Sequence, residues 1–334
     1  MSAYPSFARP DAPPAALPVA RLTFHASRYA TLSLSAFVSV LLLIAMGSIV
    51  RVTGNGLGCP DWPLCYGQAI PPWAVAPWIE FSHRWIGLAA SIQIVALAVM
   101  AWRHHRREAW VFWPMMAASG LLVVQIGLGG LHVIFELPPQ TGWIHTAVAM
   151  IIAALIAAQV AVTHPAVREL SARAPLILAR DRGLLAAVAA TAAAAFLLIL
   201  TGSYVTRSGA SLACPAFPYC GGEASSAVLR LLMNIQMLHR FMAYGVALTA
   251  CLTLWRLIRA ARGPFGKELR AAALALTVLI AVQFGLGISN VLLRLPQWSR
   301  TLHLLVAAML WAGLVMLWVA LRRGELATRS TVRE

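Results

Sequence analysis

Eight long apolar segments, separated by shorter polar stretches, dominate the pattern of the chain. Each continues for about 20 residues, which is the length that an α-helix needs to cross the hydrocarbon core of a membrane. The pattern predicts membrane-spanning helices at residues 29–50, 82–102, 111–132, 142–163, 183–205, 233–256, 270–293 and 301–321. We therefore expect an all-α integral membrane protein with eight transmembrane helices.

The composition agrees with this fold class. Of the 334 residues, 60% are hydrophobic and only 11% are charged, which is about half the charged fraction of a typical soluble domain. Residues 1–28 are rich in proline and alanine and lack the short apolar core of a cleaved signal peptide. We expect this segment to be a disordered cytoplasmic tail.

The net charge of +15 comes from basic residues that are unevenly distributed. Most of the 26 Lys and Arg residues lie in the N-terminal tail, in every second loop and at the C-terminus, so they gather on one side of the membrane. Cytoplasmic loops of membrane proteins carry this excess of positive charge. The pattern predicts a multi-pass protein of a bacterial inner (cytoplasmic) membrane with both termini in the cytoplasm. It argues against nucleic-acid binding.

The chain contains an internal repeat. The stretch GSIVRVTGNGLGCPDWPLC begins at Gly47, and a similar stretch, GSYVTRSGASLACPAFPYC, begins at Gly202. Histidine and glutamine positions further along recur with the same offset of 155–158 residues. The first copy contains Cys59, Cys65, His83, Gln125 and His145, and the second contains Cys214, Cys220, His239, Gln283 and His303.

The repeat predicts two duplicated four-helix bundles in the same orientation. An even number of spans in each half requires this parallel arrangement, and it places both cysteine loops outside, in an oxidising space. The expected divisions are an N-terminal half at 29–165, a cytoplasmic linker at 166–182, a C-terminal half at 183–322 and a cytoplasmic tail at 323–334.

Four histidines fall near the outer ends of the even-numbered helices. They are His83, His145, His239 and His303. Each half thus contains two that can face each other across a bundle, and two opposed neutral imidazoles suit axial ligation of a haem iron. A single histidine at such a place is equally well explained as an interfacial group that bonds a loop carbonyl. Four at matching depth in a duplicated frame favour haem.

Three further features have open interpretations. His132 ends the third span and is either a polar interfacial group or a contact to a substrate. Glycines recur in QIGLGG and QFGLGI, where they favour either close helix packing or close approach of a flat macrocycle. Cys251 has no counterpart in the repeat and is expected to be a packing residue.

The two halves differ at one acidic position. Glu80 lies three residues before His83, on the same helix face, whereas Gln236 occupies the matching place before His239. A carboxylate beside only one site indicates that the N-terminal half performs chemistry and that the C-terminal half holds a permanent cofactor. The alternative is an acid that the dipole of the helix N-terminus stabilises.

These features together resemble the haem A synthase family. The resemblance covers residues 30–320 and rests on the eight spans, the four histidines and the motifs EFSHR, VRVTGNGLGCPDWPLC and QIGLGGLHV. It implies oxidation of the C8 methyl group of haem O to a formyl group, which gives haem A for terminal oxidases. Haem O synthase and terminal oxidase assembly are then the expected partners.

The resemblance also implies particular roles for the site residues. Haem O is expected near His83, His145 and the catalytic Glu80, and a haem b cofactor is expected between His239 and His303. The loop cysteines are expected to pair as Cys59–Cys65 and Cys214–Cys220, either as structural disulfides or as a redox relay.

Two other classes of protein remain as alternatives. A di-haem b-type electron carrier would show the same histidines, but the contrast between Glu80 and Gln236 favours an enzyme. A membrane thiol–disulfide oxidoreductase explains the cysteines and leaves the histidines without a role. The membrane electron acceptor and the formation of a homo-oligomer stay open at this stage.

Overall fold

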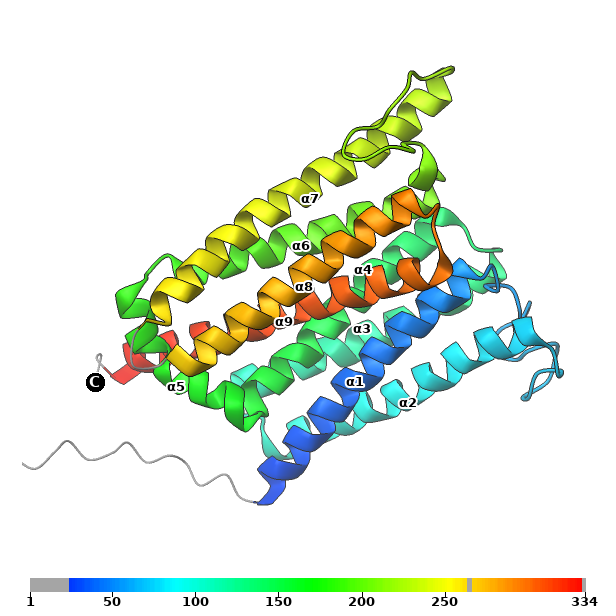
Figure 1. Cartoon of the computed structure of the whole chain (residues 1–334). Coiled ribbons are helices and arrows are strands. Elements are labelled where there is room, and N and C mark those ends of the chain that lie inside the picture. Colours follow the sequence, from blue (N-terminus) through cyan, green and yellow to red (C-terminus); the bar gives the residue numbers. More distant parts are fainter. Residues whose placement is uncertain (1–23, 263–265, 332–334) are drawn as a thin grey trace, which may run out of the picture.

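The computed structural model describes residues 24–262 and 266–331, and the described chain is helical throughout its long elements (Figure 1). The helices are α1 (Phe24–Val52), α2 (Val75–His104), α3 (Ala109–Ile134), α4 (Pro139–Thr163), α5 (Pro165–Arg180), α6 (Leu184–Arg207), α7 (Ala227–Ala260), α8 (Gly266–Leu292) and α9 (Gln297–Thr331). A short 3₁₀ helix, η1 (Ala210–Leu212), precedes α7. All of the α-helices except α5 are long and apolar enough to cross a membrane. The prediction of eight spans is therefore confirmed, and the chain is a multi-pass membrane protein.

Several helices extend beyond the apolar segments that predicted them. α2 begins at Val75 rather than at 82, and α9 continues to Thr331 through most of the segment that was expected to be a C-terminal tail. Helical hydrogen bonding is local and does not stop where the hydrophobic run stops. The hydropathy pattern therefore marks the apolar part of each helix but not its ends. Most of the predicted N-terminal tail lies outside the described residues, and α1 starts at Phe24, inside the predicted range.

The expected linker at 166–182 contains a helix of its own. α5 begins with Pro165 at its first position, where the missing N–H has no cost. Its buried residues are Leu170, Ser171, Ala174, Ile177 and Leu178. These face the bundle, because α5 packs against α4 and along α9. The helix closes one end of the molecule, near the end of α9 (Figure 1).

The eight spans form two groups with the same pattern of contacts. In the first group, α1–α4, helix α1 packs against α2 and α4, and α3 packs against the same two helices. In the second group, α6–α9, helix α6 packs against α7 and α9, and α8 packs against the same two. Each group is thus a closed ring of four helices.

The two groups meet along α1 and α4 on one side and along α6 and α9 on the other. Two tryptophans bond across this interface: Trp143 Nε1 donates to the Leu200 carbonyl at 2.9 Å, and Trp311 Nε1 donates to the Met150 carbonyl at 3.1 Å. α4 and α9 are accordingly the most buried of the eight spans. The interface is an integral part of the core rather than a contact between separable domains.

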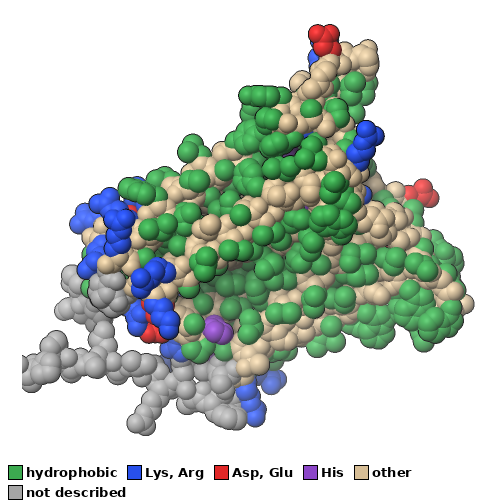
Figure 2. All heavy atoms as spheres, viewed as in Figure 1, with side chains coloured by type: hydrophobic (Ala, Val, Ile, Leu, Met, Phe, Trp, Pro, Cys, Tyr) green, Lys and Arg blue, Asp and Glu red, His purple; other side chains and the backbone are tan. Residues whose placement is uncertain are grey.

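The surface shows how the molecule meets its surroundings. Figure 2 shows hydrophobic side chains over the middle of the visible face, while Lys and Arg side chains gather mainly at the end that carries α5. Large exposed apolar side chains occur on nearly every span, as expected where lipid replaces water.

The crossing of α5 and α9 generates a test of the packing. A Cβ added at Gly324 of α9 would overlap the Ser171 carbonyl oxygen and lie 2.6 Å from the Ala174 Cβ. Gly324→Ala should therefore push α5 away from α9 and lower the free energy of unfolding by about 1–3 kcal/mol. Thermal unfolding of the purified protein in detergent measures this effect.

Gly313→Ala is the matched control, because a Cβ at Gly313 of the same helix meets nothing within 4 Å. It should leave the unfolding temperature unchanged or raise it slightly, since alanine favours a helix. Equal unfolding temperatures for Gly324→Ala and the parent protein would contradict the close crossing.

Candidate functional site

The four histidines predicted from the repeat come together as two pairs. His83 of α2 and His145 of α4 belong to the first ring of four helices, and His239 of α7 and His303 of α9 line one cavity in the second. In each group the two rings come from helices that are not adjacent in the chain. The structure thus brings together the residues that the spacing had matched.

Each imidazole ring lies against a glycine of the neighbouring helix. A Cβ on the glycines of α1 and α6 would lie 3.0 Å from the imidazole Cε1, and on those of α3 and α8 it would lie 3.5 and 3.4 Å away. The contacts join Gly47 to His83, Gly202 to His239, Gly129 to His145 and Gly287 to His303. These glycines make room for the rings, which is a more specific role than close helix packing in general.

Several buried polar atoms around the rings have no hydrogen-bond partner among the described residues. They include the Nδ1 atoms of His83, His145 and His303 and the Oε1 atoms of Gln125 and Gln283. The Nε2 atoms of His145 and His303 lie 3.0 and 3.4 Å from the glutamine amide nitrogens. Buried polar groups are nearly always satisfied. Their concentration around these four rings is typical of a ligand site.

A cavity of about 220 Å³ opens between the helices of the second group. His239 and His303 both line it, together with Gln283 and Gly287. Its remaining lining is largely aliphatic or aromatic, which suits a flat apolar macrocycle. Two histidines that face one apolar cavity fit the axial ligation of a haem, so the donor set matches the expected cofactor.

The loop cysteines form two disulfides. Cys59 is bonded to Cys65 and Cys214 to Cys220, with Cα–Cα distances of 4.7 and 4.2 Å. These are the pairings that the family resemblance implied. Cys59, Cys65 and Cys214 are almost fully buried, so their disulfides lie under the loop surface rather than at its tip.

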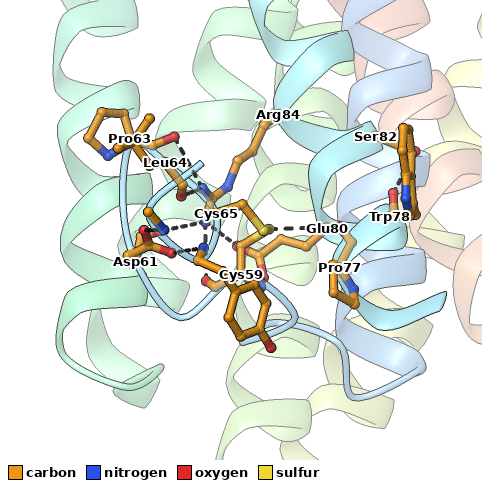
Figure 3. The surroundings of a disulfide bond; sticks show 12 residues. Cys59, Asp61, Pro63, Leu64, Cys65, Pro77, Trp78, Glu80, Ser82 and Arg84 are labelled. Carbon is orange, nitrogen blue, oxygen red and sulfur yellow. Dashed lines mark hydrogen bonds and ion pairs between the residues drawn. A yellow bond between two sulfur atoms is a disulfide. The ribbon is translucent and has the colours of Figure 1, made fainter. Parts of the chain in front are cut away.

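Glu80 connects α2 to the first cysteine loop (Figure 3). Its carboxylate accepts a hydrogen bond from the Cys59 backbone N–H at 2.8 Å and forms an ion pair with Arg84 at 2.6 Å. Arg84 also donates to the carbonyls of Leu64 at 2.7 Å and Asp61 at 3.0 Å. The acid is 4% exposed and lies one turn before His83. It is therefore placed between the histidine pair and the disulfide loop.

Asp61 closes the same loop from within. Its carboxylate accepts hydrogen bonds from the Tyr66 N–H at 2.6 Å and the Gly67 N–H at 2.7 Å. The Gly67 bond is the main reason that the pKa of the Asp61 carboxyl is held below its usual range. The loop thus keeps an ionised carboxylate that its own backbone stabilises.

The second loop is held by an arginine in the matching position. Arg240 donates to the carbonyls of Ala216 at 2.7 Å, Cys214 at 2.8 Å and Tyr219 at 2.9 Å. Among the residues that the structure describes, no carboxylate joins it, and the Oε1 of the buried Gln236 has no hydrogen-bond partner. Both loops are therefore held by an arginine that follows the first histidine, whereas only the arginine of the first loop, Arg84, is paired with a carboxylate among the described residues.

Arg84 and Arg240 were missed in the sequence. The signal was present, because both copies of the repeat read His-Arg. The loop carbonyls that they bind could not be inferred, because those contacts span 20–26 residues and depend on the folded loop.

The remaining candidates take peripheral places. The His132 ring Nδ1 lies 2.7 Å from the Thr141 hydroxyl, which links the end of α3 to the start of α4. His105 pairs with Glu108 at 2.9 Å, at the opposite end of these helices. Cys251 is exposed on the surface of α7, so the expectation that it is a packing residue is wrong.

The fold and the site define a helical multi-pass membrane protein with paired, partly buried histidines beneath disulfide loops. A family model described as cytochrome oxidase assembly protein (COX15-CtaA) matches residues 30–315. The chain belongs to this family.

Similar curated proteins cover most of its length. It is 30% identical to a haem A synthase of Alkalihalophilus pseudofirmus over 283 residues, which are 83% of this chain and 92% of the relative. It is 28% identical to a haem A synthase of Halalkalibacterium halodurans over 296 residues, which are 86% of this chain and 95% of the relative.

The arginine anchor of the second loop gives a prediction. Arg240→Met keeps much of the length of the side chain but removes the donors to the loop carbonyls. Hydrogen bonds from charged groups contribute about 1.5–3 kcal/mol each where they are buried, so we expect a lower unfolding temperature and faster amide exchange in residues 208–222. Hydrogen–deuterium exchange with mass spectrometry measures the loop directly.

Arg230→Met is the control, because Arg230 lies exposed on the same helix. It should change neither quantity. Unchanged exchange in the loop of Arg240→Met would show that the disulfide alone holds its shape.

Proposed function

We propose that this protein is a haem A synthase that oxidises the C8 methyl group of haem O to a formyl group. The observation that carries the proposal is the pairing of two partly buried histidines under a disulfide loop in each helix group. Relatives named haem A synthase match most of the chain, and the family takes part in cytochrome oxidase assembly.

The two helix groups are proposed to be duplicated halves, 29–165 and 183–322, with one haem each. The matched ring contacts, the four glycine–histidine contacts and the two arginine-anchored loops support the duplication. In this proposal, His239 and His303 ligate a resident haem b, and the cavity between them supports that assignment.

The N-terminal half is proposed to bind haem O between His83 and His145. The support is the asymmetry in charge, because Glu80 is present only there and Gln236 replaces it in the other half. A site that must handle developing charge benefits from a carboxylate, whereas a site that only holds a cofactor does not.

Glu80 is proposed as the catalytic residue of this half. The bound haem iron supplies the redox chemistry that side chains lack. Glu80 takes a proton from the attacking water or stabilises positive charge at the carbon that is oxidised. Its two hydrogen-bond partners, Arg84 and the Cys59 N–H, fix its orientation beside the site. The electrons leave to a membrane acceptor.

The setting is proposed to be a bacterial inner membrane, with both termini in the cytoplasm and the disulfide loops outside. The clustering of Lys and Arg at the α5 end supports this orientation (Figure 2). Haem O synthase would supply the substrate, and terminal oxidase assembly would receive the product.

The first test concerns the two haems. His303→Ala should remove the low-spin haem b signal from the purified protein, because one of its two proposed axial ligands is lost. His145→Ala is the matched variant in the other half and should leave that signal intact. Absorption spectra and haem extraction followed by chromatography measure both outcomes.

The extracted haems also separate the enzyme from an electron carrier. The enzyme should hold one tightly bound haem b and one exchangeable haem O or haem A. Two tightly bound b haems, or an unchanged low-spin signal in His303→Ala, would contradict the proposal.

The second test concerns Glu80. Glu80→Gln changes charge with almost no change in volume and makes the first site resemble the second. The rate of haem A formation should fall by about 10²–10⁴-fold, the usual contribution of one such group. Haem b content should stay near normal, and haem O should accumulate.

Glu136→Gln is the control, because Glu136 is an exposed acid between α3 and α4. It should form haem A at the parent rate. Normal turnover by Glu80→Gln would leave Glu80 with a purely structural role in the loop, and amide exchange in residues 53–68 would reveal that role.

A further inference from the structure

Three arginines lie at the loop end of the helices without a carboxylate partner. Arg51 is near the end of α1, Arg207 ends α6 and Arg300 is in the first turn of α9. None of them takes part in the ion pairs of the described residues. All three are partly buried, and the Arg207 Nε is buried without a hydrogen-bond partner.

These arginines are also close to one another. Arg51 and Arg300 line the same cavity, and so does Thr206, the residue directly before Arg207. Partly buried like charges without a counter-ion are unfavourable, because they lose hydration and repel one another. The arrangement therefore calls for an anion that is not part of the protein chain.

The position of Arg207 shows where this anion would lie in the first helix group. A Cβ added at Gly142 of α4 would overlap the Arg207 guanidinium. Gly142 lies three residues before His145, so the guanidinium of α6 rests about one helical turn from that ring, on the loop side.

The second helix group also has a guanidinium at the corresponding place, but there the arginine belongs to the histidine-bearing helix itself. Arg300 is the repeat counterpart of Gly142, because it lies three residues before His303. Arg300 lines the cavity that His239 and His303 share, and Arg51 of the first group lines the same cavity. Each histidine pair thus has a guanidinium next to its α4 or α9 member, and each receives one arginine from the other group.

A haem carries two propionate carboxylates on one edge of its ring. When the iron lies between two histidines, that edge can face the loop end of the bundle, where the arginines are. Guanidinium groups bind carboxylates through paired, charge-assisted hydrogen bonds that are strong in an apolar site. The arginines therefore match the one strongly charged part of the ligand.

We propose that these arginines are the propionate-binding groups of the two sites and that the two halves exchange them. Arg207 of the C-terminal half binds a propionate of the haem in the N-terminal half. Arg300 and Arg51 bind the propionates of the haem in the C-terminal half. This inference rests on the proposed function, since it takes a haem in each half. It makes the substrate site dependent on a residue of the cofactor half.

The experiment isolates one site at a time in the full-length purified protein. A His239→Ala/His303→Ala background leaves only the N-terminal site, which is titrated with iron protoporphyrin IX and, separately, with its dimethyl ester. Arg207→Leu should weaken binding of the free acid about 10- to 100-fold and leave binding of the ester unchanged. Arg300→Leu should change neither in this background.

The reciprocal background, His83→Ala/His145→Ala, should reverse this pattern. There, Arg300→Leu should weaken binding of the free acid, and Arg207→Leu should have no effect. A further variant moves the charge: Gly142→Arg/Arg207→Val places the guanidinium on α4, as α9 has it, and should restore binding toward the parent value. Rescue by this variant separates a charge effect from a defect in folding.

The outcomes distinguish the inference from the proposed function. If the parent protein binds neither porphyrin, the proposed function fails. If it binds both and Arg207→Leu binds the free acid as tightly as the parent, the propionate contact is overturned. Equal weakening of binding for the acid and the ester would also overturn it. So would anionic lipid that copurifies with the parent protein but not with the arginine variants.

Discussion

The placement of four partly buried imidazole rings inside an apolar helical bundle is the constraint on which the rest of this structure depends. A polar ring is costly to place away from water unless its nitrogens are bonded. Here only part of that bonding comes from the protein: Thr201 contacts His239, and Gln125 and Gln283 contact the α4 and α9 rings. The glycines of the neighbouring helices then leave the rings space without closing the site. The imidazole rings are held in position, but the Nδ1 atoms of His83, His145 and His303 have no hydrogen-bond partner among the described residues. Polar atoms left unpaired in this way are typical of a ligand-binding site.

The disulfide loops are the second element that this arrangement needs. Each loop lies beside the first histidine of its group and is tied to that helix by an arginine one residue further on. The arginine bonds reach several loop carbonyls, so the loop follows the helix as a unit. In the first group, Glu80 also takes part in the contacts between the helix and the loop. Its carboxylate is therefore both a structural partner of the loop and a neighbour of His83. If Glu80 acts in catalysis as proposed, chemistry and loop order are linked at one residue.

The interface between the two groups has a different character from a contact between independent domains. It contains the most buried helices and tryptophan hydrogen bonds in both directions. At this interface the guanidinium of Arg207 also packs against Gly142, where a larger residue would leave it no space. A duplicated protein could keep two self-contained sites. Here Arg207 of the second group lies against Gly142 of the first, and Arg51 of the first group lines the cavity of the second, so charged side chains cross the interface in both directions.

The sequence by itself determined the number of spans, the repeat and the pairing of histidines with their counterparts. These follow from hydropathy and spacing, which are local properties of the chain and survive in the folded state. It also indicated Glu80 as the distinguishing acid. The tertiary structure decided the rest. It showed that the linker forms α5, because that helix is stabilised by packing on α9 rather than by a continuous apolar run. It placed Arg84 and Arg240 on loop carbonyls and Arg207 against Gly142, since such contacts join residues far apart in the chain. The sequence indicates on which side of the membrane a long charged side chain lies. Which group that side chain contacts depends on the helix that packs beside it.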